Sequence, residues 1–152
     1  MTNMQELHAR WSDPEVARRI LEEHHVWAVV GCSPDPARAS HGVSRTLMAY
    51  GYEMIPIYPR ETTIHGIATV PDLATASAQR PTDSPIEVVD IFRASHRAGA
   101  HIDEAIAIGA RAVWMQLDVW DEAAAERAAA AGLLVVMDRC PAIDLPNLIR
   151  SA

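Results

Sequence analysis

Short apolar runs alternate with more polar, helix-like stretches along this chain. The apolar runs, each of the length of one strand, cover residues 26–31, 52–58, 86–92, part of 111–119, and 133–137. The stretches with helical features cover residues 14–23, 40–50, 95–108, 122–131 and 144–150. The long connection 59–85 has the weakest pattern, with one short segment at 72–77. The pattern therefore predicts strands that alternate with helices.

Residues that favour helix ends support these bounds. Ser40 and Asp121 are good N-cap residues for the helices that they precede. Gly51 and Gly132 can end the same two helices. Pro14 suits the first turn of the N-terminal helix, because its missing N–H would be unpaired there in any case.

Strands that alternate with helices of this length pair in parallel through right-handed crossovers. The sequence therefore predicts an α/β fold, a three-layer doubly wound Rossmann-like parallel sheet of five strands. Numbered along the chain, the expected strand order is 3-2-1-4-5. We expect a single domain over residues 1–152, with a core at about 15–149, because no repeat or linker divides the chain.

Composition narrows the class of protein. A net charge of -7 over 152 residues argues against a general nucleic-acid binder or a binder of acidic membranes. We expect no leader segment, because residues 1–11 have no basic region followed by an apolar stretch, and no membrane helix, because no apolar run approaches the roughly 18 residues that one needs. Cys32 and Cys140 lack metal-type spacing, so we expect reduced thiols, no bound metal and a cytoplasmic protein.

Arginines gather where the predicted strands end. In a doubly wound sheet, ligands bind beyond the carboxyl ends of the strands, at the point where the strand order reverses. The order above puts that point between strands one and four. Three of the five strand ends carry an arginine, and Arg38 lies in the first loop. Because guanidinium groups pair well with phosphate, the sequence predicts a phosphate-bearing ligand at this edge.

Two common nucleotide signatures are absent. The loop after strand one lacks Gly-x-Gly-x-x-Gly, and the chain has no Gly-Lys-Ser/Thr triplet, which disfavours ordinary NAD and ATP sites. Strand two is followed by Arg60 rather than by an acid, which suits a phosphorylated ribose, although Glu61 follows it. NADP and coenzyme A both carry such a phosphate, and the residues alone leave both open.

A wider set of motifs resembles the small stand-alone CoA-binding proteins, which are related to the CoA-binding domain of the succinyl-CoA synthetase α subunit. The resemblance covers about residues 15–149. It rests on Gly31-Cys32-Ser33 with Pro36, Arg38 and Ser40, Gly51-Tyr52, Ile55-Pro56, Gly66, Val89 to Arg93, Ala105 to Ala110, Val113 to Leu117, and Val135 to Cys140.

The resemblance implies a Rossmann-like domain that holds coenzyme A or an acyl-CoA across the strand ends. It implies a pyrophosphate loop from Gly31 to Ser40 and an adenosine wall at Tyr58 and Pro59. Together with the strand-end argument, the candidate binding residues are Gly31, Cys32, Ser33, Arg38, Ser40, Tyr58, Pro59, Arg60, Phe92, Arg93, Gln116, Leu117 and Arg139. Asp118 departs from the family, which usually has Gly there, and its carboxylate is expected to narrow the pocket or repel phosphate.

No catalytic residue is predicted. Asp90 and Asp138 lie in or beside apolar strands, where the pKa of a carboxyl can rise, but we expect them to accept loop N–H groups or to neutralise Arg93 and Arg139. The sequence thus favours a CoA-binding module without catalysis of its own. The alternatives are an NADP-type oxidoreductase and an accessory subunit of an acyl-CoA synthetase or ligase. The expected partners are a small nucleotide ligand and, as open possibilities, a second copy of the chain or an acyl-CoA enzyme.

Overall fold

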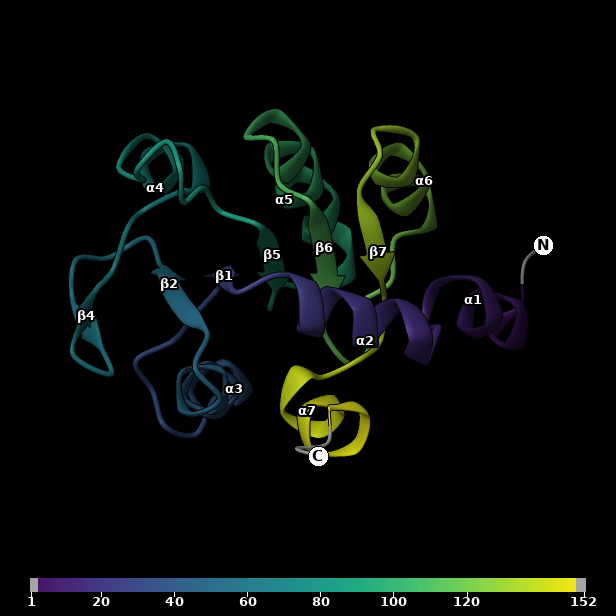
Figure 1. The fold of residues 1–152 in the computed structure, drawn as a ribbon, viewed down its shortest axis with the longest axis horizontal. Coiled ribbons are helices and arrows are strands. Elements are labelled where there is room, and N and C mark those ends of the chain that lie inside the picture. The colour runs from purple at the N-terminus through teal and green to yellow at the C-terminus, as the bar shows by residue number, and fades with distance from the viewer. Residues whose placement is uncertain (1–2, 150–152) are drawn as a thin grey trace.

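A five-stranded parallel sheet forms the centre of the molecule. The computed structural model describes residues 3–149 and orders the strands β2-β1-β5-β6-β7 (Figure 1). The strands are β1 (Val26–Val30), β2 (Glu53–Ile57), β5 (Val88–Ile91), β6 (Ala112–Met115) and β7 (Leu134–Val136). All neighbouring pairs are parallel. The predicted α/β class and Rossmann-like parallel sheet are confirmed.

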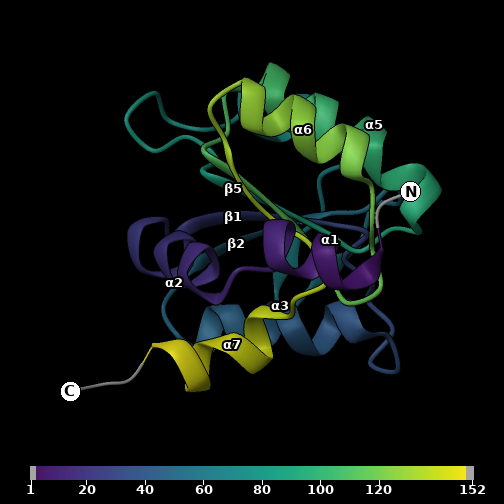
Figure 2. The ribbon, with the colours of Figure 1, turned by 90° about the vertical axis from the view of Figure 1, so that its right-hand side faces the viewer.

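Helices cover both faces of this sheet, as a three-layer fold requires (Figure 2). One face carries α4 (Leu73–Ala78), α5 (Ser95–Ala107) and α6 (Glu122–Ala130). The other face carries α2 (Pro14–Glu23), α3 (Ala39–Ala49) and α7 (Pro141–Leu148). The remaining helix, α1 (Met4–Trp11), lies on the β7 side of the molecule.

The predicted strand order 3-2-1-4-5 is wrong. The third strand along the chain, β5, pairs with β1, with Val30 opposite Ile91, and does not lie outside β2. Numbered in the same way, the observed order is 2-1-3-4-5. The order reverses between β1 and β5, so the ligand position expected from topology moves from the β1–β6 gap to the junction of β1 and β5.

The connection after β2 explains this order. Val70 pairs with the outer edge of β2, where its N–H donates to the Pro56 carbonyl at 3.0 Å and its carbonyl accepts the Tyr58 N–H at 2.9 Å. A small hairpin of β3 (Thr63–Ile64) and β4 (Ile67–Ala68) precedes this contact. Because the connection itself occupies part of that edge, the chain crosses over β1 to place β5.

The core lies on both faces of the sheet. All residues of β1, β5 and β6 are buried, as the continuous apolar runs predict. Val89 and Ile91 face the α4–α6 side. Trp27 and Trp114 face the α2, α3 and α7 side, with ring centroids 5.5 Å apart. The central strands are therefore held by packing on both faces, which fixes where their carboxyl ends lie.

Two helix starts differ from expectation, and one helix was not predicted. The helix α3 begins earlier, with Arg38 at the N-cap, so Ser40 lies inside the first turn rather than at the cap. The last helix begins at Pro141 rather than at 144, and residue 150 of the predicted range lies outside the described residues. The sequence reading also missed α1, whose N-cap Asn3 accepts the Glu6 N–H at 2.8 Å.

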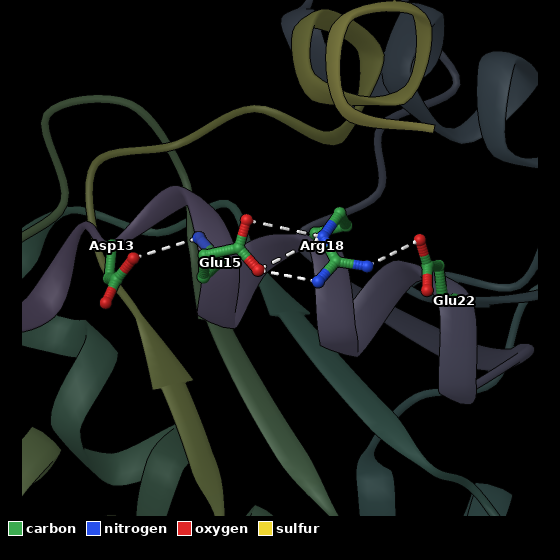
Figure 3. A network of polar contacts seen from close by, with 4 residues as sticks. All are labelled: Asp13, Glu15, Arg18 and Glu22. Carbon is green, nitrogen blue, oxygen red and sulfur yellow. Dashed lines mark hydrogen bonds and ion pairs between the residues drawn. The ribbon is translucent and has the colours of Figure 1, made fainter. Parts of the chain in front are cut away.

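The helix α2 has the predicted start and an exposed row of ion pairs. The Asp13 carboxylate accepts the Glu15 N–H at 2.9 Å, and Arg18 bridges Glu15 at 2.6 Å and Glu22 at 2.9 Å (Figure 3). Exposed pairs at this spacing stabilise a helix only slightly. The cap at α6 is also as predicted, because Asp121 accepts the Ala124 N–H at 3.0 Å.

Gly31 is the point at which β1 meets the end of β5. Its φ is +77°, and a Cβ built there would lie 2.5 Å from the backbone carbonyl oxygen of Phe92. Backbone atoms on both strands leave little room for adjustment. Glycine is therefore required both by the left-handed conformation and by the close approach.

We expect Gly31→Ala to lower the free energy of unfolding by more than Gly132→Ala. Gly132 has a similar φ of +91° but nothing within 4 Å of a built Cβ, so it is a control for backbone strain alone. Strain at a left-handed position is about 1–3 kcal/mol, and the clash with Phe92 adds to it at Gly31. Urea unfolding of both variants measures the difference, and equal losses would show that the contact has room for a methyl group.

Candidate functional site

Most of the candidate binding residues surround one cavity at the carboxyl ends of the strands. This cavity has a volume of about 620 Å³, which is in the range of small-molecule sites. Eleven of the thirteen candidates line it: Gly31, Ser33, Arg38, Ser40, Tyr58, Pro59, Arg60, Phe92, Arg93, Gln116 and Leu117. Their contact with a ligand stays a prediction.

The loop between β1 and α3 is held by its own hydrogen bonds. Gly31 N and Cys32 N both donate to the Ile57 carbonyl, at 3.1 and 3.2 Å, which fixes the start of the loop against β2. The Ser33 N–H donates to Ser40 Oγ at 2.9 Å, so the two serines tie the loop to the first turn of α3. No side chain caps the N-terminus of α3, whose Ala39 and Ser40 line the cavity. Its free N–H groups favour an anion there.

Three arginines line the cavity from three different loops. Arg38 precedes α3, Arg60 follows β2 and Arg93 follows β5. None of the three forms an ion pair with any residue from 3 to 149. Arg38 and Arg60 are exposed and Arg93 is half-buried. The cavity therefore carries positive charge that the described protein does not neutralise.

Two candidate residues do not line the cavity. The Cys32 side chain is fully buried among α2, α3 and sheet residues, where burial raises the pKa of its thiol. Arg139 is held by Asp144, with bonds of 2.7 and 2.9 Å, and donates to the Ser12 carbonyl at 2.9 Å. The structure thus gives Cys32 a packing role and gives Arg139 the role of joining β7, α7 and the α1–α2 link.

The lining also includes Ala39, Val43 and Val119, which were not predicted, and Cys140, which the family resemblance places in the pocket less firmly than the other residues. Cys140 is the N-cap residue of α7 and only 7% exposed. Burial raises the pKa of its thiol, against the opposing effect of hydrogen bonds from the Gln116 side chain and from the backbone N–H groups of Ile143 and Ala142.

A buried carboxyl group lies in β5, two residues before the cavity-lining Phe92. Asp90 is fully buried in β5, in register with Val29 and Trp114, and neither of its oxygens has a hydrogen-bond partner. Gln116 Oε1 is likewise unpartnered. The expectation that Asp90 accepts a loop N–H or neutralises Arg93 is wrong. Asp138 does accept such a bond, from the Asp118 N–H at 2.7 Å.

Burial raises the pKa of Asp90 well above its ordinary value of 3.8. Burial thus disfavours a negative charge on β5, close in the chain to Phe92 and Arg93 of the cavity lining.

A second cavity, of about 520 Å³, lies between β2 and α4 and is lined by none of the candidate residues. Within residues 3–149 there is no cluster of three or more His, Cys, Asp or Glu suited to a metal ion, and no helix long and apolar enough to cross a membrane.

A model of the CoA binding domain matches residues 25–146, from the start of β1 into α7. The chain belongs to the CoA binding domain family. The match covers every strand of the central sheet and all of the cavity-lining residues. The resemblance on which the sequence reading relied is thereby confirmed.

Individual proteins are also similar to this chain. It is 32% identical over 123 residues to an uncharacterised protein, YneT, of Bacillus subtilis (strain 168), covering 81% of this chain and 87% of YneT. A hypothetical protein from Pyrococcus horikoshii OT3 has 30% identity and a TM-score of 0.80, over 91% of this chain and 93% of that one. These relatives extend the likeness over nearly the whole chain.

A more distant likeness concerns the fold alone. The dinucleotide-forming acetyl-coenzyme A synthetase 1 of Ca. Korarchaeum cryptofilum has 22% identity and a TM-score of 0.63. The matched region covers 76% of this chain but 26% of the synthetase chain. This chain therefore has the fold of one part of that much larger enzyme.

Asp90 gives folding stability a specific pH dependence. Burial raises the pKa of Asp90 in the folded state. The contribution of this group to the free energy of unfolding is therefore fully present below about pH 3.8 and is lost as the pH rises toward the folded-state pKa. We expect Asp90→Asn, which cannot ionise, to become more stable relative to the natural chain as the pH rises. The gain is at most about 1.4 kcal/mol per pH unit.

Urea unfolding of both proteins at pH 5 and pH 8 measures this. The other titrating groups are common to both proteins, so they cancel in the difference between the two free energies of unfolding. A difference that stays constant between the two pH values would mean that Asp90 ionises in the folded protein much as it does in the unfolded chain.

Proposed function

We propose that the cavity binds coenzyme A or an acyl-CoA. The observation that carries the proposal is the set of three arginines, Arg38, Arg60 and Arg93, that meet at one cavity without ion-pair partners among the described residues. The protein as a whole has a net charge of -7, so such a cluster indicates an anionic ligand. Membership of the CoA binding domain family supports coenzyme A as that ligand.

The parts of coenzyme A suit different parts of this cavity. Its pyrophosphate suits the open N-terminus of α3 together with Arg38. Its 3′-phosphate suits Arg60 after β2, because this guanidinium, although it precedes Glu61, is the first charged side chain after the strand. Tyr58 and Pro59 then provide an apolar wall for the adenosine, as the resemblance implies.

The lining also supports binding without catalysis. The cavity-lining residues include no His, Asp, Glu or Lys; of the other side chains that can move protons in enzymes, Tyr58 and Cys140 line it, and burial raises the pKa of the Cys140 thiol. Ser33 and Ser40 bond to their own loop rather than to a base. We therefore propose a binding module, and we place it in the cytoplasm, in keeping with its two free and buried thiols.

Two alternatives remain as candidate functions. An NADP-type oxidoreductase would use the same arginines for the phosphorylated ribose. An accessory subunit of an acyl-CoA synthetase would supply the CoA-binding cavity to a catalytic partner. The fold shared with one part of the acetyl-coenzyme A synthetase favours this second alternative.

Titration calorimetry tests the proposal. We expect the protein to bind coenzyme A and to bind NAD, NADP and ATP at least about tenfold more weakly, since each lacks the pantetheine arm and the 3′-phosphate, and the additional phosphate of NADP is on the 2′-hydroxyl. Absence of heat with coenzyme A would refute the proposal. Equal affinity for NADP would favour the oxidoreductase, and turnover on addition of a synthetase partner would favour the accessory subunit.

Charge reversal tests the assignment of the loop. We expect Arg38→Glu to weaken coenzyme A binding by about tenfold or more, because it replaces a guanidinium–phosphate contact with repulsion. Arg45→Glu is a matched control, since Arg45 is exposed on the same helix and does not line the cavity. If both variants weaken binding equally, the effect comes from net charge and the loop is not the phosphate site.

A further inference from the structure

The strand order divides the cavity wall by charge. The basic residues Arg38, Arg60 and Arg93 all belong to loops that follow β1, β2 and β5. These three strands are neighbours on one side of the sheet (Figure 1). The other side contributes Gln116, Leu117, Val119 and Cys140, from the ends of β6 and β7. None of these carries a positive charge, so one side of the cavity suits phosphates and the other does not.

An apolar side chain is exposed on the β6 side. Leu117 is 49% exposed although it lines the cavity, and its neighbour in the lining, Val119, is 7% exposed. An exposed leucine at a cavity wall gains free energy when an apolar group covers it. This wall is continuous with the arginine-lined part, because both belong to the same cavity.

Carboxylates lie beside this apolar wall. Asp118 directly follows Leu117, is exposed, and its N–H donates to Asp138 Oδ1 at 2.7 Å. Asp138 is paired with His8 at 3.3 Å, whereas no residue from 3 to 149 forms an ion pair with Asp118. The nearby guanidinium of Arg139 is already held by Asp144. A ligand group that carries a negative charge would therefore be repelled here by the Asp118 carboxylate.

We propose that the β6–β7 side of the cavity selects CoA thioesters whose acyl group is uncharged and aliphatic. The proposal rests on the proposed function, because the phosphates of the coenzyme must occupy the arginine-lined side. The pantetheine arm then crosses toward Gln116, and the acyl group covers Leu117 and Val119. Leu117 favours aliphatic acyl groups, and Asp118 disfavours acyl groups that end in a carboxylate.

Affinities for a series of ligands test this selection in the intact protein. Calorimetry compares adenosine 3′,5′-bisphosphate, coenzyme A, acetyl-CoA, butyryl-CoA and succinyl-CoA. Burial of a methylene is worth up to about fourfold in affinity, so we expect butyryl-CoA to bind about four- to tenfold more tightly than acetyl-CoA. We expect succinyl-CoA, which has the same chain length, to bind about tenfold more weakly than butyryl-CoA at low ionic strength.

Two variants separate the contributions of Leu117 and Asp118. Leu117→Ser should reduce the preference for butyryl-CoA over acetyl-CoA by at least half, whereas Ile143→Ser, at an equally exposed residue outside the cavity lining, should leave it unchanged. Asp118→Asn should narrow the gap between butyryl-CoA and succinyl-CoA. Its φ of +63° is one that Asn adopts as readily as Asp, so the turn is retained.

The bisphosphate probe distinguishes this proposal from the proposed function. It lacks the pantetheine arm, so Leu117→Ser should not change its affinity, and any effect of Asp118→Asn on it measures the action of that carboxylate on the phosphates. If Asp118→Asn strengthens every ligand equally, the carboxylate acts on the phosphates and the selection is refuted. Equal affinity of the natural protein for all CoA species also refutes the selection while leaving CoA binding intact. Failure of every CoA species to bind refutes the proposed function itself.

Discussion

The close contact between the ends of β1 and β5 is the constraint on which the site depends. Gly31 approaches the Phe92 carbonyl so closely that a side chain on it would overlap backbone. This contact exists only because β5 pairs with β1, with Val30 opposite Ile91. It brings the loop that carries Arg38 next to the turn that carries Arg93, and β2 adds Arg60 from the other side. A sheet in which β5 lay outside β2 would put β2 between the strand that precedes Arg93 and the strand that precedes Arg38.

The same order gives the cavity its polarity. Like-charged guanidiniums repel one another, so three of them beside one cavity are unfavourable in the absence of an anion. The sheet places them over adjacent strands and leaves β6 and β7 without basic lining residues. Arg139, which could have continued the positive wall, is neutralised by Asp144 and bonded to the Ser12 carbonyl. The position expected for an anionic ligand therefore depends on the ion pair that neutralises Arg139 as well as on the three arginines that line the cavity.

Local patterns were sufficient to predict most of the elements and most of the candidate cavity wall. Continuous apolar runs indicate buried strands, and Asp13 and Asp121 cap helices where predicted. Strand order was not predictable in this way, because it depends on which segment pairs with the outer edge of β2, and Val70 lies in a stretch with little periodicity. Cys32 follows its strand as a lining residue would, yet the bonds of Gly31 N and Cys32 N to Ile57 turn the thiol into the core. Only the three-dimensional path of the loop decides between Cys32 and Cys140.

Asp90 shows how stability and ligand binding are linked in this fold. Asp90 lies in register with Val29 and Trp114, and an unpartnered buried carboxyl there is expected to lower stability by about 1–3 kcal/mol. Complete burial also raises the pKa of this carboxyl well above its ordinary value, because ionisation would leave an unsolvated charge without a partner. A rise in pH therefore weakens the strand that leads into Phe92 and Arg93 of the cavity lining, so the same residue acts on the stability of the core and on the support of the site.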